Sequence, residues 1–177
     1  MKTPVHSLFP DIDKVPEFFR DYVNAVGSSS DPIQLLEDDI KWQFSLLDNC
    51  PGLDLGYRYE PGKWTLRQLI IHLIDAEIVM GFRMLAAVRN DSNNYPGYDY
   101  ESYAESMSDD TRSWAELRAV WKSVRKQTQL FSENINQQYW DRACTVDGRK
   151  LTASLLLYII LGHPRIHFET IRKRYIP

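Results

Sequence analysis

The stretch "TLRQLIIHLIDAEIVMGFRMLAAVRND", residues 65–91, decides the fold class of this chain. Thr65 and Gln68 have the spacing of a capping box, in which each side chain accepts a hydrogen bond from the backbone N–H of the other residue. The stretch therefore predicts a helix that begins here and ends near residue 90. Because apolar residues occur on most sides of this helix, we expect it to be the most buried element of a helical core.

Three further segments have the apolar spacing of amphipathic helices, with a repeat every three or four residues. They cover residues 32–49, 113–135 and 152–175. Asp31 is expected to be the N-cap of the first segment, directly before a proline that suits the first helical position. A short helix is also expected within "VPEFFRDYVNAV", residues 15–26, in an N-terminal extension that covers residues 1–30.

The connection between the second and third long helices is unusually long. Residues 91–110 are rich in Asn, Asp, Ser and Tyr and contain a Pro-Gly pair, which predicts a crossing loop. Four long helices without alternating strands predict an all-α protein, a four-helix bundle in which this loop permits a crossover. A length of 177 residues suits a single domain over residues 1–177.

Composition and charge exclude several classes of protein. A net charge of −3 and a pI near 5.8 do not favour binding to nucleic acid, which needs clustered positive charge. No apolar run approaches the ~18 residues that a membrane span requires. Cys50 and Cys144 lie far apart without a CxxC motif, as is typical of free thiols in a reducing compartment. We therefore expect a cytoplasmic protein that acts on a small molecule.

The histidines form a candidate metal site. His72 lies on the helix of residues 65–90, while His163 and His167 lie four positions apart on the last helix. All three fall on apolar, inward faces, and bundles build metal sites from such side chains. Three imidazoles with an open fourth position are typical of a catalytic divalent metal. The alternative interpretation is three half-buried histidines that serve packing alone.

Polar residues outside the histidine cluster have functional and structural interpretations. Asp75, one turn beyond His72, is a candidate catalytic base or an orienting group, or else a surface carboxylate. Glu77 lies among apolar neighbours and is expected to pair with an arginine inside the bundle. Arg83 is expected to form a salt bridge between helices rather than to bind a distal anionic group of a substrate. The tyrosines of residues 95–103 either line a pocket mouth or cover the bundle end.

Several segments together resemble the DinB-like superfamily, also described as YfiT-like metal-dependent hydrolases. They are "YRYEPGKWTLRQLIIHLIDAE", "FRMLAAVRND", "PGYDYESY" and "GHPRIHFETIRKRY". The resemblance implies a four-helix bundle that holds a divalent metal through His72, His163 and His167. A site of three histidines accepts zinc, nickel, cobalt or iron, so the sequence does not name the metal. The resemblance also implies either hydrolysis or transfer of a low-molecular-weight thiol such as bacillithiol or mycothiol, and a homodimer.

The last helix departs from the pattern of these relatives. Their closing motif often resembles GHExHH, whereas this chain has Pro164 in place of the glutamate and Ile166 in place of a histidine. A proline inside a helix removes one N–H and clashes with the carbonyl four residues earlier, at a cost of ~3 kcal/mol. The sequence therefore predicts a kink near Gly162.

The main alternative is a protein without catalytic activity. The chain would then be a stress-related binding protein, or a dimeric scaffold, that keeps the bundle without the chemistry. A stripe that contains Trp114 and Trp121 offers a contact surface for such a dimer, although packing in the core also explains it.

Overall fold

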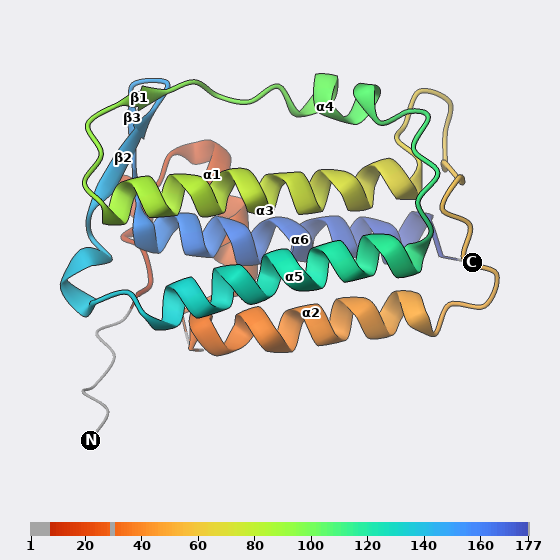
Figure 1. The fold of residues 1–177 in the computed structure, drawn as a ribbon, viewed down its shortest axis with the longest axis horizontal. Helices are drawn as coiled ribbons and strands as arrows, with labels where there is room; N and C mark the ends of the chain where they lie inside the picture. The colour runs from red at the N-terminus through yellow and green to blue at the C-terminus, as the bar shows by residue number, and fades with distance from the viewer. Residues whose placement is uncertain (1–7, 29–30, 177) are drawn as a thin grey trace.

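Four long helices form the body of the protein in the computed structural model, which describes residues 8–28 and 31–176. They are α2 (Pro32–Asp48), α3 (Leu66–Val88), α5 (Trp114–Glu133) and α6 (Ala153–Arg174). They lie side by side in Figure 1, where α3 and α5 run in one direction and α2 and α6 in the other. The predicted all-α four-helix bundle is confirmed. Among the described residues, no helix has both the length and the apolar character to cross a membrane.

The caps of these helices follow the sequence prediction. The side chain of Asp31 accepts hydrogen bonds from the first turn of α2. Thr65 and Gln68 form the predicted capping box before α3, and Ser113 and Glu116 form a second one before α5. These side chains satisfy backbone N–H groups that the first helical turn leaves without partners, which explains why each helix begins where it does.

The order of the helices is not a simple up-and-down arrangement. Helix α2 packs against α5 and α6, and α3 packs against the same two helices, so helices that follow each other in the chain lie diagonally across the bundle. The segment that joins α3 to α5 therefore crosses the full length of the bundle, as Figure 1 shows. It was predicted to be a loop, but it contains strand β1 (Asn94–Tyr95) and helix α4 (Tyr100–Ser106).

A small sheet, absent from the sequence prediction, closes one end of the bundle. Strands β2 (Ala143–Val146) and β3 (Arg149–Thr152) pair antiparallel, and β1 adds to β2 in parallel register. Asp147 and Gly148 form the turn, with φ angles of 48° and 73°. Two successive residues with positive φ are what a tight hairpin turn requires. The sheet anchors the crossing segment to the chain that leads into α6.

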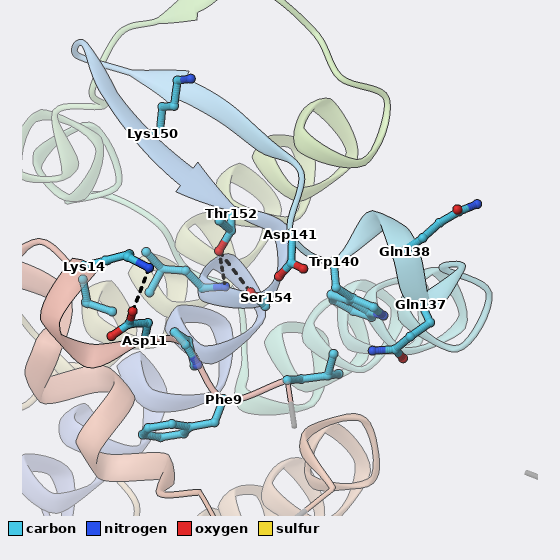
Figure 2. A pocket seen from close by; sticks show the side chains of 14 residues that line it. Phe9, Asp11, Lys14, Gln137, Gln138, Trp140, Asp141, Lys150, Thr152 and Ser154 are labelled. Carbon is cyan, nitrogen blue, oxygen red and sulfur yellow. Dashed lines mark hydrogen bonds and ion pairs between the residues drawn. The ribbon is translucent and has the colours of Figure 1, made fainter. Parts of the chain in front are cut away.

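A wide cavity of about 770 Å³ lies at the same end of the molecule. It is bounded by residues 8–15, by the turn η2 (Gln137–Tyr139) and by the start of α6. Lys14, Asp141 and Lys150 give it a mixed charge (Figure 2). None of the three candidate metal ligands lies among its described lining residues, so it is separate from the histidine cluster.

Helix α1 (Glu17–Val26), which confirms the short helix predicted within residues 15–26, packs closely against α6. The contact depends on Gly162, because a β-carbon at this position would collide with the backbone carbonyl of Tyr22. Helix α6 runs through Pro164 as one continuous element. The proline therefore does not end the helix, and the kink near Gly162 stays a prediction.

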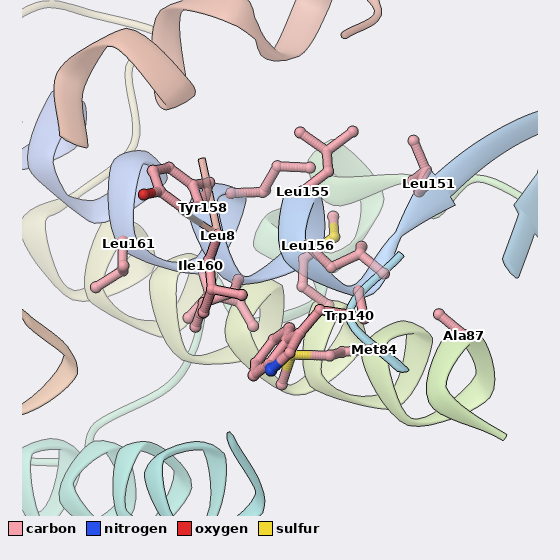
Figure 3. Close-up of a cluster of buried hydrophobic side chains, with 14 of the residues drawn as sticks. Leu8, Met84, Ala87, Trp140, Leu151, Leu155, Leu156, Tyr158, Ile160 and Leu161 are labelled. Carbon is pink, nitrogen blue, oxygen red and sulfur yellow. The ribbon is translucent and has the colours of Figure 1, made fainter. Parts of the chain in front are cut away.

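The core consists of two apolar clusters. One lies towards the sheet and includes Met84, Trp140, Leu156 and Ile160 (Figure 3). The other surrounds Trp121 at the opposite end. Trp121 is fully buried and serves the core, whereas Trp114 is half-buried and donates a hydrogen bond to Asp48. Between the two clusters, α3 carries Glu77 and α6 carries His163 and His167, which form a polar layer across the bundle.

Candidate metal centre

The structure brings together three histidines from two helices. His72 projects from α3, and His163 and His167 project from successive turns of α6. Their candidate ligand atoms all lie within 4.8 Å of one another. The Nε2 atoms of His72 and His163 are 3.0 Å apart. Because α3 and α6 pack against each other along the bundle, two inward faces are enough to assemble the cluster.

Burial keeps these imidazoles uncharged. His72 and His163 are only 7% and 9% exposed, and His167 is half-buried. Loss of hydration lowers the pKa of His72 to about 4, with repulsion by His167 as a further cause. Burial also lowers the pKa of His167 to about 4 and that of His163 well below its ordinary value. All three rings are therefore neutral near pH 7, so each keeps a nitrogen lone pair.

Aromatic rings surround the cluster. The indole of Trp64 lies 4.9 Å from the His72 ring, centroid to centroid, and the phenol of Tyr100 lies 5.8 Å from it. Tyr22 of α1 meets His163 edge to face at 5.4 Å. The histidines thus sit at the junction of α1, α3, α4 and α6.

The histidines line a cavity of about 260 Å³. Its other lining residues are Phe18, Phe19, Tyr22, Trp64, Leu73, Ala76, Glu77, Met80, Tyr98, Tyr100, Ile159, Ile160 and Pro164. Of the tyrosines between residues 95 and 103, Tyr98 and Tyr100 contribute to the lining, so the interpretation of this run as a pocket mouth holds for these two. An ion at the histidines would face this space, which leaves room for a ligand that is not part of the protein.

Comparison with known proteins identifies the family. The model of the DinB superfamily matches residues 40–171, a range that contains all three histidines. The chain belongs to the DinB superfamily. The match begins inside α2 and ends inside α6, so it includes the crossing segment as well as the bundle. The search of curated proteins returned no match.

A solved structure resembles this DinB superfamily chain over most of its length. It is YfiT from Bacillus subtilis, described as a probable metal-dependent hydrolase with an unusual four-helix bundle topology. The TM-score is 0.64 at 20% sequence identity, and the match covers 80% of this chain and 85% of that one. At this identity the likeness establishes the fold, which agrees with the diagonal order of helices described above.

The donor set of this DinB superfamily member fits a divalent transition metal. Zinc binds histidine nitrogens at ~2.0–2.1 Å, so tetrahedral ligands lie about 3.3 Å from one another. The observed separations, 3.0 Å for one pair and at most 4.8 Å for all three, need only small ring movements to reach that value. Two ring nitrogens that face each other at 3.0 Å repel unless a proton or a cation lies between them.

Glu77 is the only carboxylate in the lining that the structure describes, and both of its oxygens accept hydrogen bonds. Arg125 donates to its Oε1 at 2.7 Å and to its Oε2 at 2.9 Å, while the Trp121 indole donates to Oε2 at 3.0 Å. Arg125 also donates to the Leu36 carbonyl. The predicted pairing of Glu77 with an arginine inside the bundle is confirmed, and most of the acceptor capacity of this carboxylate is used within the protein.

Asp75 lies apart from the histidines. It is half-buried on α3 and belongs neither to the histidine cluster nor to the described lining of the cavity. Burial raises the pKa of its carboxyl, and Arg112 partly opposes that shift. In turn, the charge of Asp75 adds to the burial that raises the pKa of Tyr98. Its role as a base or orienting group stays a prediction.

Two other predictions have different outcomes. Arg83 is only 5% exposed and forms no salt bridge within residues 8–28 and 31–176, so the expected ion pair between helices is wrong for this part of the chain. Instead it donates to the carbonyl of Pro96 at 2.9 Å, which holds the crossing segment against α3. Cys50 and Cys144 are both free, as predicted.

Proposed function

We propose that this DinB superfamily member is a metal-dependent hydrolase of small substrates, with His72, His163 and His167 as the ligands of a divalent metal. The observation that supports this most directly is the meeting of three neutral imidazoles, two buried and one half-buried, at one wall of a cavity. A bound metal of this kind lowers the pKa of a bound water to ~7 and so supplies a nucleophile at neutral pH.

The remaining residues of the site would orient the ligands and exclude solvent. Aromatic side chains from α1 and from the crossing segment cover the histidines, so bulk water has little access. Exclusion of water strengthens each electrostatic interaction within the site. The buried Glu77–Arg125 pair holds α3 against α5 and thereby fixes the helix that carries His72.

Hydrolysis is preferred to thiol transfer because of the size of the cavity. Its 260 Å³ lies below the ~300–1,000 Å³ typical of sites for drug-sized ligands. Such a space suits one small substrate and a water molecule better than a thiol cosubstrate and an electrophile together. The same metal would nevertheless lower the pKa of a thiol, so the test includes both reactions.

The test begins with metal-free protein that is reconstituted separately with zinc, nickel, cobalt or iron. We expect one equivalent of metal per chain and turnover of small esters or amides without added thiol. The variants His163→Ala and His167→Ala should lose the bound metal, and their turnover should fall by about 100-fold or more. Tyr57→Phe, outside the cavity, is the matched control, and circular dichroism verifies folding of each variant.

Three results would count against the proposal. They are wild-type protein that takes up no stoichiometric metal, histidine variants that turn over as fast as wild type, and turnover that requires a low-molecular-weight thiol. The first result would favour the non-catalytic alternative, the second would place the activity away from the histidines, and the third would reassign the reaction to thiol transfer.

A further inference from the structure

The lining of the histidine cavity indicates which substrates it accepts. We infer that the cavity selects small neutral molecules that have a flat apolar group, such as an aryl ester or amide, and rejects substrates with a separate carboxylate or phosphate. This inference rests on the proposed function for the place of reaction and adds the class of substrate. It is carried by the charge, the aromatic side chains and the hydrogen-bonding capacity of the lining.

No cationic side chain faces the cavity among its described lining residues. Arg165, which follows Pro164 in α6, is held by Asp39 at 2.6 and 2.8 Å and by the Ala25 carbonyl at 2.9 Å. Arg83 of α3 is held by the Pro96 carbonyl. A metal ion would accept one donor atom of an anion. Any second anionic group would lose hydration without gaining a cationic partner, which is costly.

The aromatic side chains that line the cavity favour flat rings. Phe18 and Tyr22 of α1 form one wall, with their ring centroids 6.2 Å apart at 89°. Trp64 and Tyr100 form another, with centroids 6.3 Å apart at 77°. Aromatic side chains pack best against other rings, through stacked or edge-to-face contacts. Phe18 is 65% exposed at this opening, so a bound ring would cover apolar surface that now faces solvent.

Neutral hydrogen-bond donors complete the site. Within the described part of the chain, the hydroxyl groups of Tyr22, Tyr98 and Tyr100 have no protein partner, and all three residues line the cavity. A tyrosine hydroxyl is a hydrogen-bond donor at neutral pH. A phenol O–H donates well to the carbonyl oxygen of an ester or amide. These groups can thus bind a carbonyl oxygen beside the apolar ring.

The test compares 2-naphthamide with 2-naphthoate, which have the same ring system and differ in charge. Both are titrated into metal-free protein at neutral pH, with calorimetry and tryptophan fluorescence as readouts. We expect the amide to bind about tenfold more tightly or better than the carboxylate, because the carboxylate finds no cation in the cavity. Metal-free protein removes the attraction of the metal for the carboxylate, so the protein lining alone decides the result.

A variant that adds a cation tests the cause of the selectivity. Tyr100→Arg places a guanidinium at the opening, on a residue that is 43% exposed and so tolerates the change. We expect it to tighten naphthoate binding by about tenfold, since an arginine binds a carboxylate through paired hydrogen bonds. The matched control is Tyr57→Arg, also 43% exposed but outside the described lining, which should leave both affinities within about twofold of wild type.

Equal affinities, a preference for naphthoate, or no binding of either compound at about millimolar concentration would overturn the inference. So would a Tyr57→Arg variant that gains naphthoate affinity as much as Tyr100→Arg does. These outcomes are distinct from failure of the proposed function. A protein that binds no metal can still prefer the amide, and a metal-loaded hydrolase can still prefer the carboxylate.

Discussion

Gly162 of α6 lies directly against the backbone carbonyl of Tyr22 in α1, so closely that no side chain fits between the two helices. This contact sets the position of α1 on the bundle. Helix α1 carries Phe18, Phe19 and Tyr22, which cover the histidine cluster. The absence of one β-carbon therefore determines how closely the aromatic wall approaches the candidate metal centre.

Replacement of this glycine should loosen the wall. We expect Gly162→Ala to lower the free energy of unfolding by about 1–3 kcal/mol, the usual cost of overpacking, and to weaken binding of 2-naphthamide. The control is Gly81→Ala in α3, where a new β-carbon meets no atom within 4 Å. It should stabilise the protein by about 0.5–1 kcal/mol, because alanine favours a helix interior. Urea denaturation measures the free energy of unfolding of both variants. A Gly162→Ala variant as stable as the control would contradict the role of Gly162 in the packing of α1.

The buried ion pair gives a second prediction. Arg125→Met leaves the Glu77 carboxylate without its main partner, at a position where both side chains are at most 3% exposed. Loss of one partner from a buried pair typically costs about 3–5 kcal/mol. The double variant Glu77→Gln with Arg125→Met removes the stranded charge and should recover much of that loss. Chemical denaturation would contradict the prediction if the single and double variants were equally stable.

The sequence predicted the elements whose signals are local. Asp31 and Thr65 marked two helix starts because a cap depends on hydrogen bonds within one turn. The hairpin of β2 and β3 was missed although Asp147 and Gly148 form a typical hairpin turn, because the segment was treated as a connection between helices. Helix α4 was missed for a similar reason, since its polar and tyrosine-rich composition is typical of loops.

The candidate site was predictable only in part. The inward faces of two helices placed His72, His163 and His167 together. The lining contributed by α1 was not predictable, because it depends on the close approach at Gly162. The partner of Arg83 was not predictable either, because the position of the Pro96 carbonyl depends on the course of the crossing segment. Long-range contacts of this kind have no sequence periodicity.

Asp75 should reduce stability at neutral pH. Burial raises the pKa of its carboxyl in the folded protein above the value of 3.8 expected when unfolded, so the folded state disfavours the charged form. We expect Asp75→Asn to raise the melting temperature near pH 7, and the difference to shrink as the pH falls and Asp75 itself becomes neutral. A lower kcat in the same variant would assign Asp75 a part in the reaction. A lower melting temperature near pH 7 would contradict the electrostatic argument.

The metal-free protein should become less stable in mild acid. The folded-state pKa of His72 and of His167 is about 4, against 6.5 as the ordinary value. Below pH 6.5 the unfolded chain therefore binds protons that the folded chain does not, so stability falls towards pH 4. His72→Leu should lose part of this dependence. Thermal unfolding in the presence of a chelator measures the difference, and parallel pH profiles for variant and wild type would contradict it.

The most direct test of the metal site is an anomalous difference map from crystals of the wild-type protein grown with zinc. We predict one peak between His72, His163 and His167, with zinc–nitrogen distances of about 2.0–2.1 Å and an open position towards the cavity. No peak at this place, or imidazole rings turned apart with apolar side chains between them, would contradict a metal-dependent function for this site.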